Sequence, residues 1–80
     1  INIYPNPTSG KINIQMDDIQ SDKLEIKVTN TLGQLVLSET SGIKDEASIN
    51  IPGNAGIYFL EITAENGARF TEKIIKKDWE

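Results

Sequence analysis

The sequence predicts an all-β domain, an antiparallel β-sandwich of about seven short strands. Apolar residues recur at every second position along most of the 80 residues, a period that places them on one face of a strand. Clusters of Gly, Pro, Asn and Asp interrupt this alternation at intervals of roughly 8–12 residues. No window keeps the i, i+3, i+4, i+7 apolar spacing of a helix.

The first two expected strands flank a proline-rich loop. A short strand at residues 1–3 stops at the segment YPNPTSG, residues 4–10. Pro5 and Pro7 fix the backbone φ angle and lack N–H donors, while Gly10 gives freedom to turn, so we expect a rigid loop. The second strand carries alternating apolar residues on one face: Ile12, Ile14 and Met16.

The alternation is clearest in the strand expected at residues 23–29. It ends at the segment NTLGQ, residues 30–34, where Gly33 can adopt a positive φ at little cost. Another strand follows at residues 34–40. The residues expected to face inward from these two strands are Leu24, Ile26, Val28, Leu35 and Leu37.

Three more strands are expected in the C-terminal part. One lies at residues 47–51, the next begins at Gly56, and Asn66-Gly67 favours a type I′ hairpin turn into a return strand at residues 69–76. Tyr58 is expected in the core, with a partner for its hydroxyl at the rim. The apolar residues of these strands are Ala47, Ile49, Ile51, Tyr58, Leu60, Ile62, Phe70, Ile74 and Ile75.

These alternating sets supply the two inner faces of an immunoglobulin-like sandwich. The Cys–Trp–Cys hallmark of true immunoglobulin domains is missing, because the chain has no cysteine and Trp79 follows the last strand. We therefore expect the sandwich architecture of immunoglobulin domains, but not membership of the immunoglobulin family itself. The sequence begins directly in a strand pattern, so we expect a piece of a longer protein whose export signal lies upstream.

Charge and hydropathy argue against nucleic acid and membrane as partners. Eight basic against twelve acidic residues give a net charge of −4, whereas phosphate binding needs a basic face. No apolar run approaches the ~20 residues of a membrane span, so no direct membrane insertion is expected. Residues 69–80 nevertheless form a mildly basic tip, for which an edge strand guarded by lysines is the simplest explanation.

Residue types that carry catalysis are scarce. Without His or Cys, catalytic triads and thiol chemistry are excluded, and the serines lie in turns or strand ends without the surroundings of a Ser–Lys dyad. Asp17, Asp18 and Asp22 offer oxygen ligands for Ca²⁺, but their spacing does not match the twelve-residue calcium loop. We therefore expect a protein that is not an enzyme and has no metal site and no cofactor.

Four segments carry a family resemblance: YPNPTSG with KINI (residues 4–14), NTLGQ (30–34), GIYFL (56–60) and FTEKIIK (70–76). In this order and spacing they resemble the C-terminal sorting domain (type A) of cargo proteins of the bacterial type IX secretion system, found in Bacteroidota. The resemblance covers nearly all of residues 1–77, which we expect to form the domain. The remaining segment 78–80 is a short C-terminal extension, whereas the family commonly stops near its final lysine.

The resemblance implies a secretion and sorting signal that directs an upstream cargo domain of the same chain across the outer membrane. The implied partners are the outer-membrane translocon and, in many cargoes, a cell-surface sortase that removes the domain. The implied route runs through the periplasm to the cell surface or the medium. An immunoglobulin-like spacer and a carbohydrate-binding module remain alternatives, the latter with stacking candidates Tyr4, Tyr58, Phe59 and Trp79.

The candidate residues form two groups. The basic tip suggests that the terminal strand presents charge and backbone groups to the translocon, as in strand addition. The expected recognition residues are Lys73, Ile74, Ile75, Lys76 and Lys77. The residues expected to serve the motifs mainly by shaping turns and core are Pro5, Asn6, Pro7, Gly10, Leu32, Gly33, Gln34, Gly56 and Tyr58.

Overall fold

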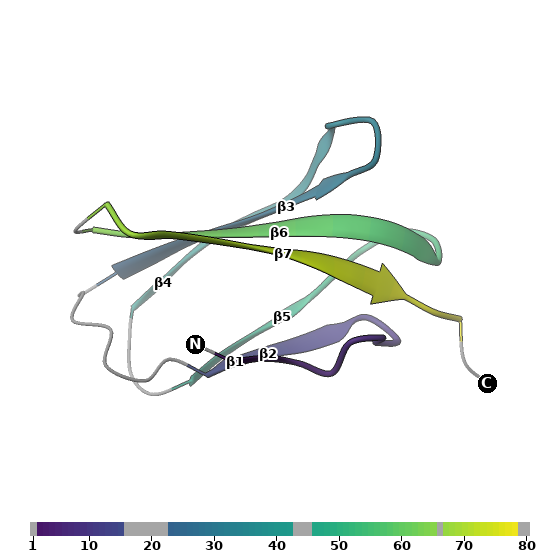
Figure 1. Ribbon diagram of the computed structural model, residues 1–80, viewed down its shortest axis with the longest axis horizontal. Coiled ribbons are helices and arrows are strands. Elements are labelled where there is room, and N and C mark those ends of the chain that lie inside the picture. Colours follow the sequence, from purple (N-terminus) through teal and green to yellow (C-terminus); the bar gives the residue numbers. More distant parts are fainter. Residues whose placement is uncertain (1, 16–22, 43–45, 66, 79–80) are drawn as a thin grey trace.

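The computed structural model describes residues 2–15, 23–42, 46–65 and 67–78 and is all-β (Figure 1). Its described part holds no helix that would be long and apolar enough to cross a membrane. The seven strands agree with the predicted number. They are β1 (Asn2–Tyr4), β2 (Lys11–Gln15), β3 (Lys23–Asn30), β4 (Leu35–Gly42), β5 (Glu46–Asn50), β6 (Gly56–Ala64) and β7 (Arg69–Lys76).

The strands form two antiparallel sheets that face each other (Figure 1). The smaller sheet has the order β1-β2-β5 and the larger the order β4-β3-β6-β7. The predicted sandwich is therefore confirmed. The β6–β7 hairpin is also present, closed by a bond in which the Ala64 amide donates to the Ala68 carbonyl at 2.8 Å. The turn type depends on Asn66, which lies outside the described residues, as do Met16, Asp17, Asp18, Asp22 and Trp79.

The core lies between the inner faces of the two sheets. Its members come from alternate strand positions, as the period-2 pattern predicts. In the larger sheet, Ile26 lies opposite Ile62 and Val28 opposite Leu60, and all four are at most 1% exposed. The buried apolar residues are Ile12, Ile14, Leu24, Ile26, Val28, Ile49, Ile51, Tyr58, Leu60, Ile62, Ala64 and Ile74.

The expected inward position of Leu35 is wrong. Leu37 lies opposite Val28, but Leu35 lies opposite the next residue, Thr29, so Val36 is an extra residue in β4. Such a bulge interrupts the two-residue period. Val36 and Leu37 both pack against the core, whereas Leu35 lies on the outer face and is 55% exposed.

Candidate functional site

The last strand, β7, lies at the edge of the larger sheet and has one strand partner, β6. An edge strand presents unpaired backbone groups to any chain that meets it. In this protein the second half of that edge is closed by the proline-rich loop that follows β1. The isolated bridge between Thr8 and Lys76 is parallel and joins the first motif to the last.

Four hydrogen bonds fix this loop on β7. The Asn6 side chain bonds twice, because its Nδ2 donates to the Lys73 carbonyl at 2.8 Å and its Oδ1 accepts from the Ile75 amide at 3.0 Å. The Thr8 amide donates to the Ile75 carbonyl at 2.9 Å, and the Lys77 amide donates to the Thr8 carbonyl at 2.7 Å. The edge from Lys73 to Lys77 is thus occupied within the molecule.

Thr8 holds the loop in its turn. It is 1% exposed, and its hydroxyl donates to the Lys11 carbonyl at 2.6 Å and accepts from the Gly10 amide at 3.0 Å. Without these two hydrogen bonds, burial of the hydroxyl would destabilise the fold, because its lost contact with water would not be compensated. Sequence reasoning singled out the prolines, Asn6 and Gly10, but missed Thr8.

The Lys76 ammonium is also used internally. Nζ donates to the Ile51 carbonyl at 2.8 Å and to the Gly53 carbonyl at 2.7 Å, so it ties β7 to the chain that follows β5. A Cβ at Gly10 would lie in ordinary contact with Lys76 Cε, at 3.5 Å, so the backbone conformation, and not lack of space, favours glycine there. The φ of Gly10 is +141°, a conformation that L side chains rarely adopt.

The five expected recognition residues therefore differ in exposure. Ile74 is fully buried in the core, and Lys76 is half-buried with its ammonium engaged. The side chains of Lys73, Ile75 and Lys77 are exposed. Within the residues that the structure describes, neither Lys73 nor Lys77 forms an ion pair or a side-chain hydrogen bond.

The NTLGQ turn between β3 and β4 is built by three of its residues. Asn30 Oδ1 accepts from the amides of Leu32 at 2.9 Å and Gln34 at 3.0 Å, and Asn30 Nδ2 donates to Gln34 Oε1 at 2.9 Å. Gly33 adopts a φ of +81°. The Leu32 side chain takes no part in these bonds and is 81% exposed.

Tyr58 occupies its predicted place. The residue is 7% exposed, and its hydroxyl donates to the Asn54 carbonyl at 2.7 Å, which confirms the expected hydrogen-bond partner. Gly56, which opens β6, has a φ of +155°. The described aromatic candidates for a glycan platform are separated, because Tyr58 is buried, Tyr4 lies on β1 and Phe59 faces outward from β6.

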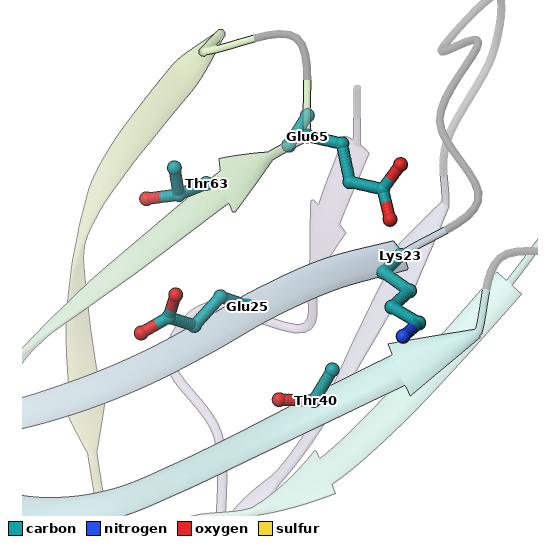
Figure 2. Close-up of a pocket in the computed structure, with 6 residues that line it drawn as sticks. Lys23, Glu25, Thr40, Thr63 and Glu65 are labelled. Carbon is teal, nitrogen blue, oxygen red and sulfur yellow. The ribbon is translucent and has the colours of Figure 1, made fainter.

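A charged groove of about 210 Å³ lies at the other end of the larger sheet. Figure 2 shows Lys23 and Glu25 of β3, with Thr40, Thr63 and Glu65, around it. No group of three or more His, Cys, Asp or Glu side chains able to hold a metal ion occurs among the described residues.

Charges beside this groove compensate each other. Lys27 Nζ lies 2.9 Å from Glu25 Oε1, and the hydrogen bond and negative charge of Glu25 raise the pKa of Lys27. Both groups are exposed, so this pair contributes little to stability. The groove contains none of the expected recognition residues.

The family model of the secretion system C-terminal sorting domain matches residues 2–77. The chain belongs to this family. As a sorting domain it is the type IX secretion signal of a cargo protein and is not itself catalytic, and it implies export to the cell surface or secretion. An upstream cargo domain in the same chain is supported as well.

This sorting domain is also similar to part of the ulvan lyase NLR42 of Nonlabens ulvanivorans. The identity is 32% over 79 residues, which cover 94% of this chain. The chain spans only 14% of the length of that protein. The source of this relative, Nonlabens ulvanivorans, is consistent with the expected origin of the chain in Bacteroidota.

Proposed function

We propose that the type IX translocon recognises this domain through the outward side of β7 after the cargo has entered the periplasm. The recognition residues in this proposal are Lys73, Ile75 and Lys77. Membership of the sorting family supports the type of partner. A surface sortase that removes the domain after translocation completes the proposed route.

The proposal rests on how the side chains of β7 are distributed between the inside and the outside of the molecule. Alternate residues serve the inside of the molecule, since Ile74 is in the core and Lys76 binds two carbonyls. The residues that alternate with these two have exposed side chains: Lys73, Ile75 and Lys77. Unpaired cations beside an exposed apolar residue suit recognition better than stability.

The expected strand addition at this edge does not fit the structure. The outward backbone groups of Lys73, Ile75 and Lys77 already bond to Asn6 and Thr8. A partner strand would first have to displace the proline-rich loop from this edge. We therefore propose contact through side chains.

Export of a reporter tests this proposal. A periplasmic fluorescent protein would be placed upstream of residues 1–80 in a type IX-competent host, with Lys73→Gln and Lys77→Gln combined. We expect less reporter outside the cell, because two cations that face the partner are lost while both residues are exposed and leave the fold intact.

The matched control combines Lys11→Gln and Lys27→Gln, which makes the same change in net charge at other strands. We expect its export to equal that of the parent. Equal export from the Lys73/Lys77 variant, with the domain folded, would refute the proposal.

A further inference from the structure

Four large apolar side chains share the outer face of the larger sheet, on the side that does not meet β1, β2 and β5. Their exposed fractions are 55% for Leu35, 42% for Ile57, 45% for Phe59 and 36% for Ile75. We name these four residues the sheet-face patch. They come from β4, β6 and β7 and lie at the end where β3 and β7 finish.

The strand register makes this patch continuous. Thr29 lies opposite Leu35 on one side and opposite Phe59 on the other, and Ile57 lies opposite Ile75. Directly opposed residues project from the same face, with Cβ atoms about 4.5–5.5 Å apart. The patch thus extends from one edge of the sheet to the other. The bulge in β4 completes it, because it turns Leu35 outward.

Core packing does not account for these side chains. The opposite face of the same strands already supplies buried residues, with Tyr58 and Leu60 alternating with Ile57 and Phe59. Apolar residues on an open sheet face favour aggregation unless something covers them. The exposed positions therefore point to a surface that is covered in the working complex.

Charges on this face are divided between its two ends. The distant end carries both signs, including the Glu25–Lys27 pair. Beside the patch stand two cations, Lys73 opposite Phe59 and Lys77 two residues beyond Ile75, while the carboxylate of Glu61 lies one row further away, opposite Lys27. Among the described residues neither Lys73 nor Lys77 forms an ion pair, so both ammonium groups are available to a partner that covers the patch. Carboxylates are the side chains that complement them.

The turn between β3 and β4 borders the sheet-face patch on one side. This turn bends away from the smaller sheet (Figure 1). Leu32 in this turn is 81% exposed although the turn's hydrogen bonds do not involve its side chain. A partner seated on the sheet-face patch would have an apolar residue of the turn beside it.

We infer that the sheet-face patch is a docking surface for a protein whose contact surface is apolar at its centre and carries carboxylates opposite Lys73 and Lys77. This inference rests on the proposed function, which makes the translocon that protein. A second copy docked patch to patch would bring together two chains that each carry a net charge of −4. An anionic lipid surface would be repelled by the net charge of −4.

Binding of the purified chain to the detergent-solubilised type IX outer-membrane translocon of a competent host tests the inference. The variant combines Ile57→Thr and Phe59→Thr, which keep residues that suit a strand but remove the apolar surface. We expect its Kd to rise about tenfold or more, as for central apolar contacts of an interface. The control is Glu61→Thr on the same face of β6, with an unchanged Kd and an unchanged unfolding midpoint expected.

Four results would count against the inference in different ways. Absence of binding by the parent chain overturns the proposed function and the inference with it. Equal Kd values for parent and double variant overturn the inference alone. Patch-dependent self-association in sedimentation, without patch-dependent translocon binding, assigns the surface to a second copy. Patch-dependent binding to vesicles of anionic phospholipid, but not to the translocon, assigns it to a membrane.

Discussion

Lys76 belongs to the family's terminal motif, yet its ammonium lies on the Ile51 and Gly53 carbonyls. Asn6, from the first motif, occupies backbone groups of Lys73 and Ile75 in the same part of β7. Lys76, which was expected to take part in recognition, thus serves the fold, and Asn6, which was expected to shape the turn, also anchors β7. The segment KIIK, residues 73–76 at the end of the FTEKIIK motif, therefore combines the exposed Lys73 with the structural Lys76.

Replacing Lys76 by Met separates the charge of this residue from its stem. Met preserves much of the aliphatic chain, but it leaves two carbonyls without their donor. We expect the free energy of unfolding to fall by about 1–3 kcal/mol, as for hydrogen bonds to charged groups. Urea denaturation measures this loss.

Lys73→Met is the matched control, because Lys73 is exposed on the same strand. Its unfolding free energy should stay within about 0.5 kcal/mol of the parent value. An equal effect of the two substitutions would show that the Lys76 bonds contribute no stability of their own.

At the scale of elements, the alternating side chains of β7 serve both the core and the outer face of the larger sheet. Its inner side seals the core through Ile74, and its outer side adds Ile75 to the sheet-face patch. The proline-rich loop fixes the strand's free edge at the same residues. The strand is therefore held on three sides, and its outer face is left for contact.

The adjacent isoleucines of β7 provide a direct comparison. Ile74→Ala creates a cavity in the core and should lower the unfolding free energy by about 2–5 kcal/mol. Ile75→Ala removes a side chain that is 36% exposed, and it should have a clearly smaller effect on stability. Similar losses from the two substitutions would contradict the assigned inner and outer faces. Thermal or urea unfolding distinguishes these outcomes.

Local patterns predicted the strands, because alternation and turn residues act over a few neighbours. The inner positions of β3 and β6 and the core place of Tyr58 followed from them. The bulge at Val36 was missed, since one extra residue leaves no local mark in an apolar run. The Asn6–β7 and Lys76 bonds were missed because they join segments far apart in sequence.

At the scale of the whole molecule, the outer face of the larger sheet differs between its two ends. One end of the larger sheet has a groove with paired charges, and the other has the sheet-face patch with Lys73 and Lys77. A chain of 80 residues has only a small core and modest stability. Because exposed apolar area favours aggregation, its presence in such a chain calls for a functional explanation. Sorting by a protein partner offers that explanation.

The fraction of a fluorescent protein found outside the cell, when residues 1–80 follow it in a type IX-competent host, tests the sorting function most directly. The same host without its translocon is the control. We expect fluorescence in the medium or at the cell surface of the competent host, and only in the periplasm of the control. Fluorescence confined to the periplasm of both, with the domain folded, would contradict the assignment of this chain as a working sorting signal.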